Sequence, residues 1–434
     1  MDNTVERILE RASRRGASAE VFLTEHSESE VAFEAGRLKN AERKHRFGVG
    51  LRVIHEGRIG FSSASDENRI EELVDAAVAA ARFGKEAGFT FPGRSPGAAV
   101  APYDPAVASY GPGEAIREGR RAVDSLREGC PNGLTDVGIA ASIAELRIAN
   151  TSGLDVGWRS TEFRYAVTTV IVEGDSILWI SEGGRYGTLD IRTGEYVRTI
   201  ADLARKAGVR VPKVSGRLPV IFVAHELPNL LESIELGVNG LRLVKGDSPL
   251  IDREGERLLG AVSVSDNPLL TDAPGSRPYD DEGSPSRETA LFENGVFRSF
   301  LFDLDTASQA GRATTGSALR GALTPPSVGM SNLVVSTGDS DLERMIGQLE
   351  EGVIVHGVLG GGQSNLLAGD FALNIMLGFH IRGGEISGRL TDTMVSGNVY
   401  DAFGSIAAMG SVARPVGSIF TPDILFSELS VSGR

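Results

Sequence analysis

Ala166-Val167-Thr168-Thr169-Val170-Ile171-Val172 is the stretch that most clearly decides the fold of this chain. Valine, isoleucine and threonine dominate it, and these β-branched side chains fit an extended strand better than a helix. Similar strand-forming runs lie on both sides of it, at 47–54 and 218–223. Glycine is abundant between such runs: 54 of the 434 residues are glycine, roughly 12% against a typical ~7%. This composition favours many short strands joined by tight turns.

The first 88 residues combine a helical pattern with strand patterns. Val5, Ile8 and Ala12 recur at helical spacing, and alternation with a period of two follows from residue 19. A second amphipathic stretch begins after Asp66. We therefore predict an N-terminal α+β domain at 1–88, in which antiparallel strands pack against helices.

Proline and glycine are concentrated at 89–112, and neither residue continues a helix or a central strand well. This segment is predicted to be a linker. Beyond it, a helical pattern at about 113–128 precedes strongly β-forming runs. The sequence thus predicts a central α+β domain at 113–213.

The remaining residues, 216–434, form the largest predicted domain. Short strands and glycine turns dominate it, with one helix expected at about 225–238. Another helix is expected to start at Ser340-Asp341-Leu342-Glu343, which has the spacing of a capping box. The chain as a whole is predicted to be a strand-rich multidomain α+β protein. Its antiparallel or mixed sheets are expected to be flanked by helices, with a large β-rich C-terminal domain.

Charge and cysteine content exclude several classes of protein. The 44 basic and 58 acidic residues give a net charge of −14, which repels phosphate backbones and anionic lipids. We therefore predict no nucleic acid partner and no membrane partner. A single cysteine, Cys130, rules out an intrachain disulfide. Because no signal-peptide core and no run of ~20 apolar residues is present, we expect a cytoplasmic protein.

His225-Glu226 is the first candidate for metal chemistry. A zinc peptidase helix carries two histidines one turn apart and a glutamate base that activates a zinc-bound water. No second histidine follows His225 at the spacing that such a helix needs. His225 is therefore interpreted as a histidine at the start of a helix rather than as a ligand.

Other candidate motifs are incomplete. His356 and His380 are expected on strands near glycine turns, where they either meet in space or, as we favour, are separately half-buried. The glycine-rich run 357–362 matches neither a dinucleotide-binding loop nor a phosphate-binding loop, and it favours a turn or a close approach of backbone. No Gly-x-Ser-x-Gly elbow of a serine hydrolase occurs. These residues by themselves specify no enzyme.

The acidic run Tyr279-Asp280-Asp281-Glu282-Gly283 has two interpretations. Three carboxylates so close together are able to bind a hard cation. The run also lies between Arg277 and Arg287, which suits a solvated turn held by ion pairs. We favour the solvated turn.

An ordered series of short motifs runs through the last domain. Its members are Gly275-Ser276-Arg277-Pro278-Tyr279-Asp280-Asp281-Glu282-Gly283, Glu293-Asn294-Gly295-Val296, Thr315-Gly316-Ser317-Ala318, Asn332, Gly338-Asp339, Gly360-Gly361-Gly362, Gly369-Asp370-Phe371 and Ser396-Gly397-Asn398. In this order they resemble the TldD/PmbA family, also called the modulator of DNA gyrase family, and specifically its PmbA or TldE branch. The resemblance extends over nearly the whole chain. The net charge of −14 gives no support to direct binding of DNA.

The resemblance implies a two-component zinc metallopeptidase. In this family a TldD-type subunit carries His-Glu-x-x-x-His on a helix and a C-terminal cysteine ligand, whereas PmbA-type subunits usually lack the motif. In this chain Glu232, Ser233 and Gly237 stand at the motif's three named positions, and Val416 stands at that of the cysteine. The resemblance therefore implies no catalytic residue, no metal ligand and no cofactor in this chain, with zinc expected in a TldD-type partner.

The resemblance also implies a scaffold that encloses a chamber for unfolded or leader-bearing peptides. We expect a heterodimer with a TldD-type catalytic subunit, or a homodimer when the chain is alone. Because an added peptide strand is held by backbone hydrogen bonds, the chain needs no metal to help bind one. The candidate contacts with peptide or partner are Gly360, Gly361, Gly362, Asp280, Asp281 and Glu282.

Two alternatives remain open from the sequence. In the first alternative, the chain is a peptidase with an unrecognised active site, built from Glu232, Glu235 and the cluster Asp280-Asp281-Glu282. In the second alternative, it is a metal-free homodimeric protein without a catalytic partner, which binds peptides or regulates another protein.

Overall fold

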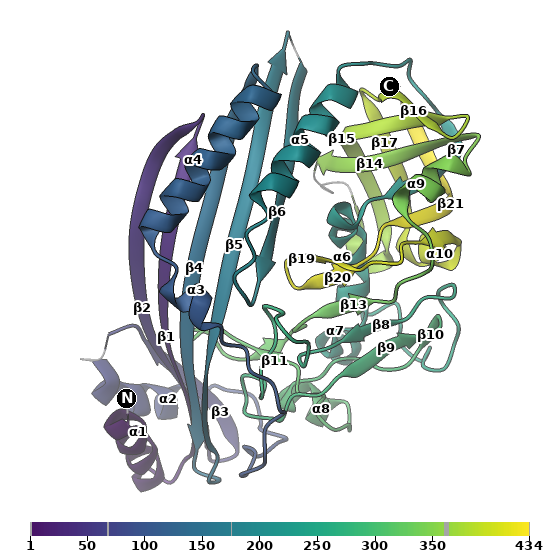
Figure 1. The fold of residues 1–434 in the computed structure, drawn as a ribbon. Coiled ribbons are helices and arrows are strands. Elements are labelled where there is room, and N and C mark those ends of the chain that lie inside the picture. Colours follow the sequence, from purple (N-terminus) through teal and green to yellow (C-terminus); the bar gives the residue numbers. More distant parts are fainter. Residues whose placement is uncertain (1, 67–68, 175, 360–363, 434) are drawn as a thin grey trace.

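The computed structural model describes residues 2–66, 69–174, 176–359 and 364–433. It is a strand-rich α+β structure in which helices flank several sheets (Figure 1), and this confirms the predicted fold class. Within the described ranges, no helix has both the length and the apolar character needed to cross a bilayer.

A long antiparallel sheet contains the first six strands, in the order β3-β2-β1-β4-β5-β6. Two-residue turns join β1 to β2 and β2 to β3, and both residues of each turn have positive φ angles, as the tightest hairpin turns require. The β-branched run 166–172 lies within β5. The strand bounds are β1 Ser18–Glu34, β2 Arg37–His55, β3 Arg58–Ala64, β4 Gly133–Asn150, β5 Asp155–Glu173 and β6 Ser176–Tyr186.

Helices cover one face of this sheet. Val21 and Val31 both point to that face from β1, because side chains ten residues apart on a strand share a side. Val21 belongs to the core beneath the helix pair at one end of the sheet, and Val31 to the core beneath the pair at the other end (Figure 1). The two pairs are α1 Asp2–Arg14 with α2 Ile70–Ala81, and α4 Pro112–Gly129 with α5 Thr193–Ala207.

The last part of the chain contains a closed ring of five strands, in the order β14-β7-β21-β17-β15, because β15 also pairs with β14. Such closure leaves these strands without a free edge. Phe222 and Val355 face a core shared with the following helices, whereas Ile221 and Ile354 face the core beneath α4 and α5. The bounds, with the attached β16 and β18, are β7 Gly216–Phe222, β14 Glu351–Leu359, β15 Asp370–Arg382, β16 Glu385–Arg389, β17 Thr393–Asn398, β18 Ile406–Met409 and β21 Ile424–Gly433.

The C-terminal half also contains a mixed sheet with the order β10-β9-β8-β13-β20-β19. A separate two-stranded sheet pairs β11 with β12. The short strands and frequent turns of these sheets agree with the predicted β-rich C-terminal region. The bounds are β8 Val264–Asp266, β9 Thr289–Glu293, β10 Val296–Phe297, β11 Ala318–Leu319, β12 Ser327–Val328, β13 Leu333–Val335, β19 Arg414–Val416 and β20 Ile419–Thr421. The short helices of this half are α6 Pro228–Gly237, α7 Gly240–Lys245, α8 Leu304–Gln309, α9 Leu342–Gly347 and α10 Val399–Gly404.

Two local expectations change in the structure. Asp341, not Ser340, caps α9, with its carboxylate accepting from the N–H of Arg344 at 2.8 Å. Ser340 instead forms a β-bridge with Gly410, so it lies outside the helix. The predicted linker contains a five-residue helix, α3 (Pro105–Ser109), whose first residue is a proline, as the first turn of a helix allows.

The first two predicted domains contribute strands to one continuous sheet, since β1 pairs with β4 along most of its length. The division at 88, 112 and 213 therefore describes segments of sequence around a shared sheet, and as a division into domains it stays a prediction.

A buried ion network joins the long sheet to the C-terminal half. Arg52 of β2 pairs with Glu20 of β1 at 3.1 Å and with Glu282 at 2.5 Å. Arg320 pairs with the other oxygen of Glu20 at 2.9 Å. All four side chains are at most 5% exposed. The pairs Arg52–Glu282 and Glu20–Arg320 thus form only while the two halves stay together.

Glu282 of the acidic run 280–282 belongs to this network, and the whole run is buried, so the expectation of a solvated turn is wrong. Asp280, Asp281 and Glu282 are all buried. The carboxylate of Asp280 accepts from the N–H of Glu282 at 3.0 Å, which shapes the turn. The expected ion pair with Arg277 is present, at 3.4 Å from Asp281, but Arg287 donates to a backbone carbonyl of another loop instead.

We predict that Arg52→Met lowers the free energy of unfolding by about 3–5 kcal/mol, because Glu20 and Glu282 are left buried without their shared partner. Chemical denaturation followed by circular dichroism measures the loss. Arg43→Met is the matched control, since Arg43 is an exposed arginine on the same strand, and it is expected to change stability by less than about 0.5 kcal/mol. Equal stabilities for the two variants would contradict the role given to Arg52.

Candidate functional site

The helix at which the resemblance places the zinc motif is α6. Strand β7 leads into a single 3-10 turn, η2 (Ala224–Glu226), and then into α6, where Pro228 occupies the first turn. Leu230, Leu231 and Ile234 are fully buried and fix the orientation of the helix. The expected helix at 225–238 is therefore present, with His225 in the 3-10 turn that precedes it.

The three motif positions on α6 have different surroundings. Glu232 is exposed to solvent, whereas Ser233 and Gly237 are buried. The hydroxyl of Tyr400, on α10, lies 2.4 Å from the point that a Cβ at Gly237 would occupy. The same hydroxyl donates to the carbonyl of Ser233 at 3.5 Å.

These surroundings do not fit a zinc ion held as the resemblance implies. A histidine at Gly237 needs the space that the Tyr400 hydroxyl fills. Ser233 supplies no general base, because a serine hydroxyl is not basic at neutral pH. Across the described ranges, no three His, Cys, Asp or Glu side chains are grouped so as to hold a metal ion.

Val416 does not share a cavity with these positions. It is the last residue of β19, and it lines a different cavity from the one that Glu232 lines. The structure thus does not bring the expected cysteine position and the α6 positions into one cavity.

A cavity of about 210 Å³ lies beside α6. Glu232 and Glu235 line it from the helix, together with Asn239 and apolar side chains. Burial, with smaller effects from Glu232 and Asp266, raises the pKa of Glu235 to about 7. Asp280, Asp281 and Glu282 do not line this cavity, so the structure does not assemble the alternative active site considered from the sequence.

The other candidate contacts are placed as follows. Asp280, Asp281 and Glu282 are buried inside the chain, and Glu282 belongs to the buried ion network. Gly360, Gly361 and Gly362 lie outside the described residues. Contact of either set with a peptide or a partner subunit stays a prediction.

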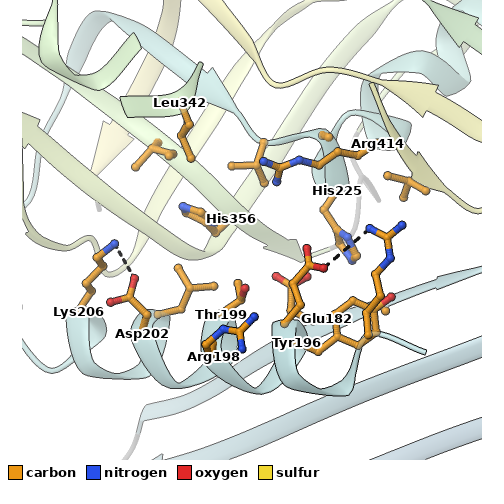
Figure 2. Close-up of a pocket in the computed structure, with 18 of the residues that line it drawn as sticks. Glu182, Tyr196, Arg198, Thr199, Asp202, Lys206, His225, Leu342, His356 and Arg414 are labelled. Atoms are coloured by element: carbon orange, nitrogen blue, oxygen red, sulfur yellow. Dashed lines mark ion pairs between the residues drawn. The ribbon is translucent and has the colours of Figure 1, made fainter. Parts of the chain in front are cut away.

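The larger cavity, of about 440 Å³, lies between the long sheet and the strand ring (Figure 2). One side is formed by β6 and α5, and the other by η2, β14, β19 and α9. Its volume falls in the range of about 300–1,000 Å³ that is usual for small-ligand sites. Apolar residues from both sides line it, including Leu203, Val223 and Ile354.

Three titratable side chains in this cavity have shifted pKa values. Burial raises the pKa of Glu182 to about 7, although the nearby Arg414 opposes the shift. Burial lowers the pKa of His225. Burial, helped by the charges of Lys206 and Arg414, lowers the pKa of His356 well below its ordinary value. Both imidazoles are therefore neutral at pH 7.

The two strand histidines are not brought together. His356 of β14 lines the large cavity. In His380 of β15, Nε2 forms a hydrogen bond with Oε1 of Glu351 at 3.1 Å, and Nδ1 forms one with the hydroxyl of Ser387 at 3.2 Å. His380 is not among the residues that line the cavity. The two histidines are thus separate, as we favoured from the sequence.

Glu182 belongs to no recognised sequence motif, but the alternation of buried residues along β6 is a signal that could have identified it. Leu178 and Ile180 are buried and alternate along β6, and Glu182 continues that alternation at the next inward position. A charged residue in an inward register is unusual enough to mark a site. That Glu182 lines one cavity with His225 and His356 depends on contacts between distant segments, which no local pattern shows.

Comparison with known proteins identifies relatives for the full length of the chain. Residues 19–81, 107–210 and 215–433 match family models described as PmbA/TldA metallopeptidase domain 1, central domain and C-terminal domain. A metalloprotease of Methanothermobacter thermautotrophicus is 26% identical over 400 residues, covering 89% of this chain and 86% of that protein. Metalloprotease PmbA of Escherichia coli O157:H7 is 24% identical over 456 residues, covering 100% and 96%.

A solved structure has the same fold. TldE from Thermococcus kodakarensis superposes with a TM-score of 0.92 at 23% sequence identity, covering 99% of this chain and 100% of that one. At this level of identity the likeness concerns the fold alone.

We predict that Gly237→Ala lowers the free energy of unfolding by about 1–3 kcal/mol, because the added methyl meets the Tyr400 hydroxyl. The same change in a Tyr400→Phe background is expected to cost at least about 1 kcal/mol less, since the hydroxyl is gone. Thermal and urea unfolding of the four proteins of this cycle measure the coupling.

Gly347→Ala is the matched control for this cycle. Gly347 also ends a short helix, α9, and a Cβ there meets nothing within 4 Å. It is expected to leave stability unchanged or slightly raised in both backgrounds. If Gly237→Ala were equally harmless, the space at this motif position would be open and the misfit to zinc would lose its main support.

Proposed function

Because the chain belongs to the PmbA/TldD metallopeptidase family, we propose that it is the non-catalytic, PmbA/TldE-type subunit of a two-component peptidase. The zinc-bearing subunit is a separate TldD-type chain with the His-Glu-x-x-x-His motif. The proposed substrates are unfolded or leader-bearing peptides, and the proposed compartment is the cytoplasm. Family membership agrees with the resemblance found in the sequence.

The packing around Gly237 is the observation that carries this proposal. A zinc peptidase needs ligands that hold the ion and a base that activates its water. At the family's ligand positions this chain has a solvent-exposed carboxylate, Glu232, and a glycine covered by Tyr400. The buried Ser233 stands at the position of the base. A single exposed carboxylate is too few ligands for a structural or catalytic zinc site.

The remainder of the fold supports a role as a partner subunit. The strand ring and the long sheet are complete, and the buried network holds them in one arrangement. A subunit of this kind contributes by completing the chamber around the peptide and by stabilising the catalytic subunit. These contributions need shape and backbone hydrogen bonds rather than a metal.

The test mixes the purified chain with a TldD-type subunit that carries His-Glu-x-x-x-His, and follows cleavage of an unfolded polypeptide by mass spectrometry. We expect no cleavage by this chain alone and cleavage by the mixture. We also expect the two chains to elute together in size-exclusion chromatography. Replacing the motif glutamate of the TldD-type chain by glutamine should abolish cleavage by the mixture, because the water then lacks its base.

Ser233→Ala in this chain is the matched variant, since it changes the equivalent position. It is expected to leave cleavage by the mixture unchanged. Cleavage by this chain alone that is lost in Glu232→Gln or Glu235→Gln would overturn the proposal in favour of an unrecognised active site. A chain that forms only homodimers and leaves the activity of the TldD-type subunit unchanged would instead support a metal-free peptide-binding or regulatory protein.

A further inference from the structure

The first part of β2, residues 37–48, forms a free edge of the long sheet. β3 pairs with β2 only from Val49 onward, and no described residue pairs with residues 37–48 on that side. Figure 1 shows this stretch, which we call the basic edge, at the outer margin of the sheet. An unpaired edge presents a row of N–H and C=O groups that another strand is able to complete.

Alternate residues of the basic edge direct their backbone groups outward. A two-residue turn joins β2 to β3, and such a turn makes His55 and Arg58 a hydrogen-bonded pair. Because the direction alternates along a strand, the odd-numbered residues from Ala41 to Phe47 point their N–H and C=O groups away from β1. No described residue forms a hydrogen bond with these outward groups. They span about 20 Å, the length of an ordinary strand.

Positive charge is concentrated on the basic edge, although the chain as a whole carries −14. Its acidic residue is Glu42. Its basic residues are Arg37, Lys39, Arg43, Lys44 and Arg46. The sign of the charge on this edge is therefore opposite to that of the chain.

Arg43 and Arg46 have no counterion in the fold. The two lysines of the basic edge pair with glutamates of the same hairpin. By contrast, no described carboxylate forms an ion pair with Arg43 or Arg46, and both side chains are exposed. The residues opposite them on β1 are Ser29 and His26, neither of which is acidic. The charges of Arg43 and Arg46 are thus free to meet a ligand.

The free backbone and the free charge together select an acidic peptide in an extended conformation. The backbone of an added strand completes the outward hydrogen bonds, and its side chains lie about 4.5–5.5 Å from those of β2. Arg43 and Arg46 are three positions apart, so they point to opposite faces of the sheet. An acidic side chain on either face of the added strand therefore has an arginine beside it.

Two other occupants fit the basic edge less well. A second copy of this chain that paired through the same edge would place like charges opposite each other, which is destabilising. The phosphates of a nucleic acid would meet the arginines, but a nucleic acid has no strand backbone to pair with the outward N–H and C=O groups. Only an acidic peptide satisfies both features.

We propose that the basic edge binds an acidic stretch of an unfolded polypeptide as an added strand beside β2. The site lies at the opposite edge of the long sheet from β6, which borders the large cavity. It goes beyond the role proposed above, because it requires neither a metal nor a partner subunit. Binding is measurable on the full chain alone, and its failure leaves the subunit proposal untouched.

The experiment measures binding of labelled probes to the full chain by fluorescence anisotropy. The main probe is an acetylated peptide of about ten residues, rich in valine, threonine and glutamate, which favour an extended acidic strand. It is expected to bind at least about tenfold more tightly than the same peptide with glutamine in place of glutamate, and rising salt should weaken it. Methylating its backbone nitrogens at alternate positions should also cost at least about tenfold, because strand pairing needs those N–H groups.

Hydrogen exchange followed by mass spectrometry locates the bound peptide. The acidic peptide is expected to slow exchange of the outward amides between Ala41 and Phe47, since these gain hydrogen bonds. Protection elsewhere with none on the basic edge would overturn the proposal. A single-stranded oligodeoxynucleotide of equal charge serves as the comparison. If it bound as tightly as the peptide, the edge would be a general polyanion site and the proposal would fail.

Two double variants assign the binding to the arginines. Arg43→Gln with Arg46→Gln is expected to weaken binding of the acidic peptide at least about tenfold. Arg117→Gln with Arg120→Gln removes the same charge at the same spacing from exposed positions on α4, and it should leave binding unchanged. No binding of the acidic peptide would leave the charges as a guard against edge pairing and would overturn the proposal. Equal binding of the glutamate and glutamine peptides, or full binding by the first double variant, would do the same.

Discussion

Burial of charge is the constraint on which the rest of this structure depends. Arg52 and Arg320 lie where the long sheet meets the C-terminal half, and their side chains are at most 5% exposed. Glu20 from the sheet and Glu282 from the acidic turn supply the opposite charges. Removing one partner from such a network costs far more than the pair contributes to stability, so the network fixes one docking geometry rather than adding much stability.

That docking geometry determines the shape of the large cavity but not that of the α6 region. The large cavity has β6 and α5 on one side and the strand ring on the other, so its shape depends on how the halves meet. The core beneath α4 and α5 also includes Ile221, Ile354 and Phe379 from the ring, and it extends the contact with apolar packing. By contrast, the α6 region is built within the C-terminal half, where Tyr400 of α10 packs over Gly237. A change at the junction should therefore disturb the cavity before it disturbs α6.

Local features of the fold follow from the sequence, because they depend on neighbouring residues. The β-branched run 166–172 lies in a strand, and the helix expected at about 113–128 is α4. The acidic turn shows the limit of such inference. Its charges led us to expect an exposed turn, because its partner Arg52 is 230 residues away in sequence and no local pattern connects the two. The absence of motif residues at Glu232, Ser233 and Gly237 was visible from the family resemblance. That Tyr400 fills the space over Gly237 was not, since this contact is formed only when α6 and α10 pack together.

The central claim is that this chain does not hold the zinc of its family. The most direct measurement is zinc per chain by elemental mass spectrometry, after purification from zinc-supplemented medium and dialysis. We predict a value near zero, because α6 presents no pair of ligands and Gly237 is covered. A value near one zinc per chain that survives dialysis would contradict the account, and it would mean that side chains from distant segments assemble a metal site.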